Sequence, residues 1–303
     1  NCLPHFSDYN GNYKNILLCH IETSHLEYTS WPSRANLMDE IWVPSQANKN
    51  SLVVSGVKEE KIKVVPIPAD TKRFSEKHKP FKIPSVEEED FVFYFVGEYI
   101  QRKNLVALIT AFHSEFEFNE NVKLVIKTNK TGLNPDQLSD EVSQKIMSVK
   151  SRLRMYPDIA DYKSDILITS YLPENQLMSL HAACDCFVMP SHGESWCIPA
   201  FDAMAMGNPV ISPKNTGMED FIKDTGWVAK SYPVPTMTKE APLSDIYTAR
   251  EKWQQVDIED LKRCMREAYE DKESYSKKSQ DGIEKAKEYS YESVAEKIKG
   301  VLS

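Results

Sequence analysis

The sequence predicts an α/β protein with two Rossmann-like, doubly wound units, each a mostly parallel sheet covered by helices. Short apolar runs typical of buried strands alternate with helical segments almost throughout the 303 residues. That length is enough for two units, and 41% hydrophobic residues can fill their cores. A polar, proline-bearing stretch at residues 73–90 separates the two series of strands and predicts an interdomain linker, which we place at residues 76–90.

The first unit, residues 1–75, contains roughly half of a doubly wound domain, so we expect it to be truncated. Its predicted buried strands are residues 15–20, 39–45 and 61–68. Ser45 is placed to cap the helix that follows the second strand. Gly56 stands where that helix needs a left-handed residue to end.

The second unit, residues 91–288, reads as a complete doubly wound domain. Its predicted strands are residues 91–97, 123–127, 165–169, 186–191, 208–212 and 226–229. Its predicted helices are residues 104–117, 136–154, 174–184, 218–222, 258–270 and 274–288, with one more beginning near Pro199. Residues 289–303 are expected to form a C-terminal helix that packs back on the first unit.

Composition excludes several classes of protein. A net charge of −8 argues against a dedicated nucleic-acid binder, although it allows a local basic patch around a phosphate. No apolar run can span a bilayer and Asn1 begins no signal peptide, so we expect a cytoplasmic location. The cysteines have no metal-type spacing, which predicts buried thiols and no metal site: Cys2, Cys19, Cys184, Cys186, Cys197 and Cys264.

The stretch "PSHGESWCIPAFDAMAMGNPVISP", residues 190–213, holds the strongest candidate site. It begins at the carboxyl end of a predicted strand, where open α/β sheets bind ligands. Pro199 suits the first position of the next helix, and Gly193 allows close backbone approach to a ligand. Four backbone amides would then face outward at a helix N-terminus and suit a phosphate: Ser195, Trp196, Cys197 and Ile198.

Two carboxylates, Glu194 and Asp202, stand eight positions apart in this stretch. A carboxylate can accept two hydroxyl hydrogen bonds in a fork, which fits vicinal diols of a sugar or a ribose. Acidic residues also simply favour helix N-termini, and the spacing alone favours that structural role. Amides for phosphate together with carboxylates for diols describe a nucleotide-sugar site.

Several motifs in order resemble the retaining glycosyltransferases of family 4, which have the two-domain GT-B fold. "GESWCIPAFDAMAMGNPVI" is similar to that family's E-x7-E pair around "GFGLP" and "EAMAxGxPVI". "FVGEYIQRKNLVALITAF" resembles the loop that opens its second domain, and "VPSQANKNSLVVSGVKEEKIKVVPIPADTKRF" resembles the end of its first. The resemblance extends over residues 15–302 and rests on the order of the motifs.

The resemblance implies roles for individual residues. Glu194, Lys103 and His20 would be catalytic: Glu194 holding the transferred sugar, Lys103 neutralising the diphosphate with Arg102, and His20 facing the sugar. Asp202 would take the ribose hydroxyls. Gly97 and the loop residues Tyr171 and Leu172 complete the donor site, which also holds the residues around Glu194: Gly193, Ser195, Trp196, Cys197 and Ile198. Purely structural alternatives stay open: a solvated basic turn at 101–104, a structural histidine at 20, and ordinary packing at 171–172.

The chain departs from the family pattern at two site positions. Asp202 replaces the second glutamate, one methylene shorter with the same charge. Glu98 follows Gly97, where the family often has arginine, so Arg102 supplies the missing cation or Glu98 points away. The glycine-rich loop expected early in the first domain is not found, so the acceptor cannot be read from the sequence.

The implied function is retaining transfer of a hexose-type sugar from a UDP- or GDP-sugar to a glycan, lipid or small-molecule acceptor, without a metal or other cofactor. The alternative is a nucleotide-sugar-binding module, or a fragment of a larger glycosyltransferase, that does not turn over. An epimerase or phosphorylase on the same fold is a weaker third reading. Many relatives act at membranes, so peripheral association stays open, but the sequence has no basic amphipathic helix to support it.

Overall fold

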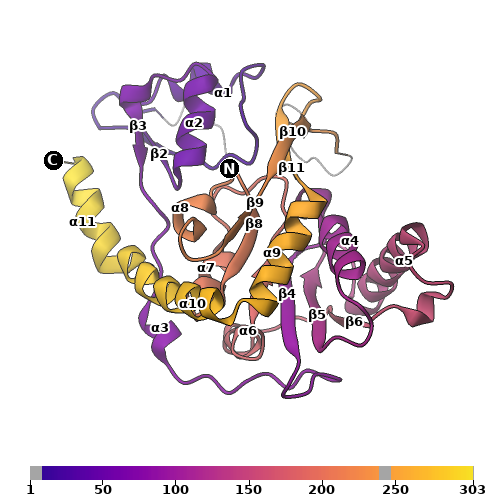
Figure 1. The fold of residues 1–303 in the computed structure, drawn as a ribbon. Coiled ribbons are helices and arrows are strands. Elements are labelled where there is room, and N and C mark those ends of the chain that lie inside the picture. The colour runs from indigo at the N-terminus through magenta and orange to yellow at the C-terminus, as the bar shows by residue number, and fades with distance from the viewer. Residues whose placement is uncertain (1–8, 239–246, 303) are drawn as a thin grey trace.

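Two parallel sheets organise the computed structural model, which describes residues 9–238 and 247–302 (Figure 1). The first sheet has three strands in the order β1-β2-β3, with all pairs parallel. Its elements are β1 (Ile16–Leu18), α1 (Trp31–Ala35), β2 (Glu40–Val43), α2 (Gln46–Val54) and β3 (Ile62–Val64). All three strands coincide with predicted ones. Cys2 lies outside the described residues.

Local signals at α2 are confirmed, whereas the prediction that the first strand is buried is wrong for Leu18. The Ser45 side chain accepts a hydrogen bond from the amide of Asn48, and Gly56 has a φ of 88° just beyond the helix. β1 lies at the edge of the first sheet, and the side chain of Leu18 is 66% exposed. An apolar run predicts a strand, but its burial depends on what covers each face.

The second sheet has six parallel strands in the order β6-β5-β4-β7-β8-β9. They are β4 (Phe91–Glu98), β5 (Val122–Asn129), β6 (Asp165–Ile168), β7 (Cys186–Val188), β8 (Val210–Pro213) and β9 (Trp227–Ala229). The chain moves outward from β4 to β6, then returns to β7 beside β4 and moves the other way. Strand order therefore reverses between β4 and β7, the place where doubly wound sheets form a ligand crevice.

Helices cover this sheet and supply much of its core. They are α4 (Leu105–Glu115), α5 (Pro135–Leu153), α6 (Glu174–His181), α7 (Ile198–Ala205) and α8 (Glu219–Ile222). The central strand β4 has six consecutive buried residues from Phe91 to Val96, as expected for a parallel strand covered on both faces. The sequence prediction of a complete second doubly wound domain agrees with this layout.

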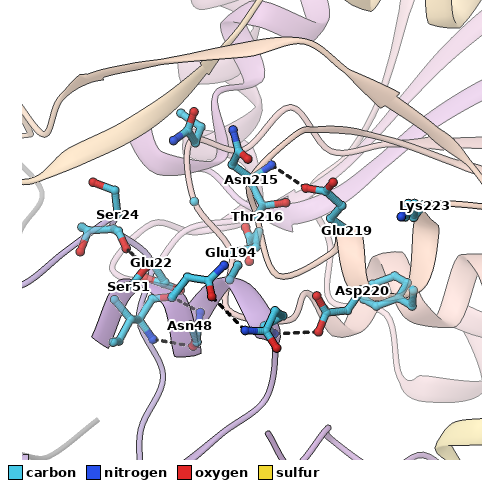
Figure 2. A pocket seen from close by; sticks show the side chains of 18 of the residues that line it. Glu22, Ser24, Asn48, Ser51, Glu194, Asn215, Thr216, Glu219, Asp220 and Lys223 are labelled. Carbon is cyan, nitrogen blue, oxygen red and sulfur yellow. Dashed lines mark hydrogen bonds between the residues drawn. The ribbon is translucent and has the colours of Figure 1, made fainter. Parts of the chain in front are cut away.

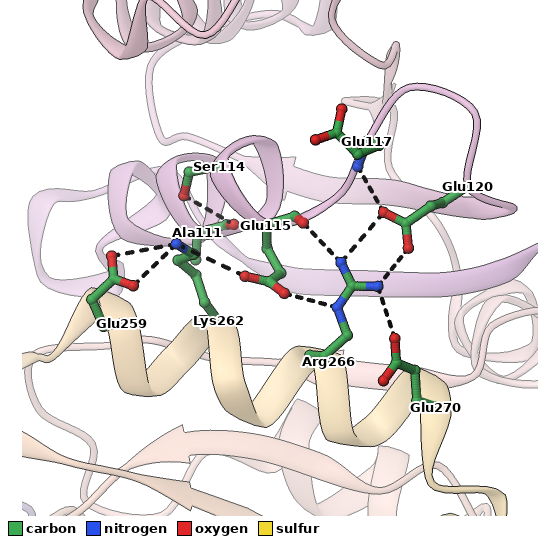
Figure 3. A network of polar contacts seen from close by, with 9 residues as sticks. All are labelled: Ala111, Ser114, Glu115, Glu117, Glu120, Glu259, Lys262, Arg266 and Glu270. Atoms are coloured by element: carbon green, nitrogen blue, oxygen red, sulfur yellow. Dashed lines mark hydrogen bonds and ion pairs between the residues drawn. The ribbon is translucent and has the colours of Figure 1, made fainter.

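The C-terminal part is helical, as expected: α9 (Ile258–Glu270), α10 (Lys272–Ala286) and α11 (Tyr291–Leu302). Arg266 of α9 bonds Glu115 at 2.8 Å and Glu120 at 2.5 Å, which joins α9 to the end of α4 (Figure 3). Lys262 extends the same network to Glu115 at 3.8 Å. These contacts, with the apolar seam beneath them, hold α4 in place.

An antiparallel hairpin that sequence reasoning missed rises beside the first unit (Figure 1). Its strands are β10 (Ser231–Pro235) and β11 (Lys252–Val256). Pro233 and Pro235 argue against a strand within a sheet, because proline cannot donate to a ladder. Proline is tolerated here because the hairpin forms a separate two-stranded sheet.

Several short segments connect the two units. Between them the chain runs through α3 (Lys72–Ser75) and a stretch without helix or strand at 76–90. Ala69, just before α3, forms a parallel bridge with Ser290, just before α11. Short 3-10 turns are η2 (Glu59–Lys61), η3 (Gln101–Lys103), η4 (Ile159–Asp161) and η5 (Lys287–Tyr289). Among the described helices, none combines the length and apolar character needed to cross a bilayer.

Candidate active site

The loops that follow β4 and β7 meet at the point where strand order reverses. After β4 the chain makes the turn η3, which carries Arg102 and Lys103. The carbonyl of Arg102 accepts hydrogen bonds from the amide of His192 at 2.7 Å and from Ser191 Oγ at 3.0 Å. Asn104 Nδ2 donates to the carbonyl of Pro190 at 3.2 Å. The basic turn is therefore tied to the predicted donor loop by backbone contacts, not solvated.

Glu194 lies at the centre of a compact charge cluster. Its Oε1 accepts hydrogen bonds from Lys103 Nζ at 2.6 Å and from Arg102 Nη1 at 2.9 Å. Arg102 also donates to the carbonyl of Gly193 at 2.6 Å. Burial disfavours the charged carboxylate, but the pull of Lys103 and Arg102 outweighs it and lowers the pKa of Glu194. Three predicted residues thus meet in one site, with the carboxylate ionised.

The first unit closes over this cluster. Glu22 bonds Arg102 Nη2 at 2.9 Å and accepts a hydrogen bond from the Tyr247 hydroxyl at 2.9 Å. Burial raises the pKa of Glu22 despite the nearby Arg102. His20 Nδ1 lies 3.4 Å from Ser195 Oγ, so this histidine does face the donor loop. Burial lowers the pKa of His20, which favours the neutral imidazole.

Gly193 lies close to the backbone of the first unit. A Cβ at this position would lie 2.0 Å from the carbonyl oxygen of Glu22, so only glycine lets the two units approach this closely. The predicted close approach of Gly193 to a ligand stays a prediction; the close approach that the structure shows is to the backbone of Glu22. Glycine at 193 supports domain contact.

The start of α7 differs in detail from the helix start that the sequence predicts. The helix begins at Ile198, one residue before the predicted start at Pro199, so Pro199 is its second residue. Cys197 precedes them with φ at 74°, in the left-handed region, where the family pattern "GFGLP" has glycine. Within the described residues, no loop or turn hydrogen bond is donated by the amides of Ser195, Trp196 or Cys197.

The side chain of Trp196 belongs to the core and not to the cleft. It is 2% exposed and packs against Phe201 and Phe221, with ring centroids 5.9 and 5.0 Å away. Only its backbone amide is available for the predicted donor contact. This aromatic packing fixes the loop just after Ser195.

Asp202 lies further along α7 than the first turn expected for it from the sequence. It is the fifth residue of α7, which has no acidic residue in its first turn. Its Oδ1 bonds Arg73 Nη2 at 2.8 Å, and no ion pair among the described residues joins it to the Glu194 cluster. Burial, partly offset by Arg73, raises the pKa of Asp202 to about 6.

The remaining predicted residues lie at the end of β4 and in the loop after β6. Gly97 sits near the end of β4, where a Cβ would lie 2.9 Å from the Phe95 ring. Tyr171 is 84% exposed and Leu172 half-buried, both in the loop after β6. β6 lies two strand spacings from β4, about 10 Å, a span that a nucleotide could bridge. Glu98 accepts a hydrogen bond from Thr131 Oγ1 at 3.3 Å.

A cavity of about 540 Å³ lies between the two units and is lined in part by Glu22 and Glu194 of the charge cluster (Figure 2). The first unit contributes the loop at 21–24 and one face of α2. The second unit contributes the loop at 192–194 and residues from 215 to 225. Labelled polar side chains line it from both units: Glu22, Ser24, Asn48, Ser51, Glu194, Asn215, Thr216, Glu219, Asp220 and Lys223.

Sequence reasoning missed Glu22, Arg73 and the hairpin residues. Glu22 lies two positions after His20, the last residue of the predicted strand at 15–20. Arg73 lies in the quoted "ADTKRF" segment. In the hairpin, Trp253 stacks on His192 with ring centroids 5.2 Å apart, a contact that no local pattern indicates.

Two further features of the described chain bear on chemistry. Cys19, Cys184, Cys186, Cys197 and Cys264 are unpaired and buried, as predicted. Across residues 9–238 and 247–302, no three histidine, cysteine, aspartate or glutamate side chains are grouped to hold a metal ion.

Comparison with known proteins identifies the family. The family model described as "Glycosyl transferases group 1" matches residues 76–241, more than half of the chain, and includes Arg102, Lys103, Glu194 and Asp202. The chain belongs to this family. Solved structures agree on the GT-B fold of this group 1 glycosyltransferase. Anabaena Alr3699/HepE in complex with UDP and glucose is 15% identical, with a TM-score of 0.66 over 95% of this chain and 70% of that one.

Two other proteins illustrate the range of the similarity. A structure described as "Trehalose-6-phosphate from E. coli bound with UDP-2-fluoro glucose" is 10% identical, with a TM-score of 0.70, over 96% of this chain and 68% of that chain. The lipopolysaccharide 1,2-N-acetylglucosaminetransferase of Salmonella typhimurium is 23% identical over 168 residues. That match includes 54% of this chain and 40% of the Salmonella enzyme, so the chain spans less than half of that relative.

Proposed function

We propose that this group 1 glycosyltransferase transfers a hexose-type sugar from a nucleotide-sugar donor to a hydroxyl-bearing acceptor with retention of configuration. The observation that carries the proposal is the Glu194–Lys103–Arg102 cluster at the point where strand order reverses. A sugar hydroxyl would bond Glu194, and the diphosphate would take the two cations together with the amides that begin α7.

Charge balance suggests how the donor enters. The cluster has two cations, Arg102 and Lys103, and two carboxylates, Glu194 and Glu22. A diphosphate adds negative charge, so one carboxylate must leave or take up a proton. Glu22 is the better candidate, because its pKa is raised while that of Glu194 is lowered. The donor would therefore replace Glu22 at Arg102 and leave Glu194 in place.

For the reaction we propose the course that the family resemblance implies. The bond between the anomeric carbon and the diphosphate oxygen breaks while the acceptor oxygen attacks from the same face. The acceptor proton passes to the departing phosphate oxygen, and Arg102 and Lys103 stabilise the charge that develops there. His20, neutral and facing Ser195, would bond the sugar as it moves. Asp202 would bind the ribose, with the base near Tyr171 and Leu172.

Support for the donor class comes from the neighbours that share the fold, whose structures contain UDP, UDP-glucose or UDP-2-fluoro glucose. We propose a UDP- or GDP-sugar for this chain, and no metal. The acceptor, a glycan or a lipid-linked or small molecule, would reach Glu194 from the 540 Å³ cavity, whose amide, hydroxyl and carboxylate groups suit a hydroxyl-rich molecule. We further propose that the protein works in the cytoplasm, with peripheral membrane contact where the acceptor is lipid-linked.

The test is ligand-observed NMR with UDP-, GDP- and ADP-sugars on the wild type, Glu194→Ala, and Glu273→Ala as a control for an exposed glutamate on α10. We expect saturation transfer to one donor, with the sugar-proton signals weakened in Glu194→Ala and unchanged in the control. No binding by a folded wild type would refute the proposal. Binding with no donor hydrolysis or transfer would support a non-catalytic module instead.

Two finer claims have their own readouts. Retention is checked by the anomeric configuration of the product in one-dimensional NMR, and an inverted product would overturn it. Activity that survives an excess of chelator is expected for a reaction that needs no metal. Activity lost with chelator and restored by a divalent cation would contradict that claim.

A further inference from the structure

The interdomain segment sends one arginine into the second unit, directly onto Asp202. Arg73 belongs to α3, between the two units, and its Nη2 lies 2.8 Å from Asp202 Oδ1. Its Nη1 bonds Glu174 at the start of α6. Asp202 is 5% exposed, so this arginine is its principal charged partner among the described residues. The contact links positions 129 residues apart in the sequence.

Neighbouring contacts hold Arg73 in this position. Its guanidinium lies over the Phe74 ring at 4.6 Å, and Phe74 packs edge-on against Phe201, the residue before Asp202. His78 Nε2 bonds the carbonyl of Arg73 at 2.7 Å. The segment is therefore fastened to α7 at two adjacent places, one ionic and one aromatic, which defines the orientation of the guanidinium.

An arginine in this place opposes the protonation of Asp202 that burial favours. A carboxyl this deeply buried tends to take up a proton, and the pKa of Asp202 is raised to about 6 even with Arg73 beside it. Aspartate is also one methylene shorter than the glutamate of the family pattern, so it has less freedom to reach a ligand. Arg73 engages one of the two carboxylate oxygens, Oδ1, through Nη2.

We propose that Arg73 is a positioning residue for nucleotide recognition, which holds the Asp202 carboxylate charged and oriented toward the ribose diol. This inference rests on the proposed nucleotide-sugar function and extends it to a residue outside the donor loop. It makes ribose recognition depend on the segment that joins the two units. A purely structural arginine would stabilise the fold without affecting discrimination between ribonucleotides and deoxyribonucleotides.

Discrimination between ribose and deoxyribose separates these roles. We would measure by calorimetry the Kd of UDP against 2′-deoxyUDP, and of GDP against 2′-deoxyGDP, at pH 7.5. The wild type should prefer the ribonucleotide by about 10-fold or more, as expected for loss of a charge-assisted hydrogen bond. Arg73→Met and Asp202→Asn should bring that ratio close to one, and Arg73→Lys should restore part of it.

Two matched variants serve as controls. Glu174→Gln breaks the other ion pair of Arg73 and should lower the ratio by less than half. Lys72→Ala changes an exposed residue of the same helix and should leave both the ratio and the melting temperature unchanged. Thermal melting of every variant identifies any loss of folding, and Arg73→Lys serves as the readout should Arg73→Met fail to fold.

The pH dependence adds a second readout. The charged and titratable groups around Asp202 are Arg73, Glu174 and, through Arg73, His78 and His181. Wild-type discrimination should decline as pH falls through about 6. In Arg73→Met that decline should begin at higher pH, since the carboxylate has lost its cation.

The outcomes are distinguishable. A folded Arg73→Met protein that keeps the wild-type ratio overturns the inference and leaves the proposed function standing. Equal wild-type binding of UDP and 2′-deoxyUDP also overturns it, because Asp202 then does not read the ribose. Failure of a folded wild type to bind any of these nucleotides overturns both the inference and the proposed function.

Discussion

The loop around Glu194 and the helix around Asp202 hold the two carboxylates of one motif in opposite electrostatic environments. Both side chains are almost fully buried, at 6% and 5% exposure for the residues. Glu194 has two cations within 2.9 Å, and its pKa is lowered. Asp202 has one, and its pKa is raised. Burial alone therefore does not decide the charge state of either carboxylate, because the cations in contact with each one oppose the effect of burial.

The two sites also differ in where their cations come from. Lys103 and Arg102 are neighbours in the turn after β4, so one short motif brings both to Glu194. Arg73 reaches Asp202 from the segment between the two units. The cations at Glu194 therefore come from the same domain as Glu194, whereas the cation at Asp202 comes from the segment that joins the domains.

The largest expected effect contrasts the two carboxylates in catalysis. Glu194→Gln should lower kcat/KM for release of the nucleoside diphosphate by about 100-fold or more, because it removes a contact at the reacting sugar. Asp202→Asn should lower it by about 10-fold, since the ribose is remote from the reacting bond. Steady-state kinetics with the donor identified by NMR would measure both, and a larger loss in Asp202→Asn would reverse the assignment.

Stability against pH should have opposite signs at the two sites. Because the folded pKa of Asp202, about 6, exceeds its ordinary 3.8, the folded state binds the extra proton between those values. The free energy of unfolding of the wild type should therefore fall by about 3 kcal/mol relative to that of Asp202→Asn as pH rises through that window. The pKa of Glu194 is lowered in the folded state. Its contribution to the free energy of unfolding is therefore present above pH 4.5 and is lost as pH falls through the folded-state pKa.

Urea unfolding of the wild type and both variants from pH 3 to 8 would measure this contrast. The difference in unfolding free energy between Asp202→Asn and wild type should move in favour of the variant as pH rises. The difference for Glu194→Gln should move in favour of the wild type. Parallel stability curves for wild type and either variant would contradict the charge states described.

Removing the carboxylate that competes with the donor should have a smaller effect. Glu22→Gln frees Arg102 from one ion pair, so a nucleotide sugar should bind about 3- to 5-fold more tightly. Glu40→Gln removes a carboxylate of the first unit that pairs with Lys14 and serves as a control without effect on binding. Weaker binding by Glu22→Gln in calorimetry would show that Glu22 contacts the donor directly.

An effect of similar size is expected at the backbone before α7. Cys197 has a left-handed conformation that costs a non-glycine residue about 1 kcal/mol. Cys197→Ala loses the buried thiol and keeps that cost, whereas Cys197→Gly relieves it. Cys197→Gly should therefore be more stable than Cys197→Ala by about 1 kcal/mol in urea unfolding. Equal stability of the two variants would mean that the loop relaxes to another conformation.

Much of the fold was predictable because its signals are local. Apolar runs placed all six strands of the second sheet, and Ser45 and Gly56 marked the ends of α2. The hairpin was missed because its prolines oppose a strand locally and its stability comes from pairing with a distant segment. Leu18 was expected to be buried, since hydrophobicity predicts a strand but not its position at an edge.

By itself, the sequence determined the order of strands and helices, the loop that holds Glu194 and the basic turn with Arg102 and Lys103. Those features depend on residues close together in the chain, where spacing and backbone preferences act directly. Only the tertiary structure decided that Glu22 opposes Arg102, that Gly193 meets the first unit and that Arg73 holds Asp202. Each is a contact between distant segments, and charge alone does not say which opposite charge a buried group will meet.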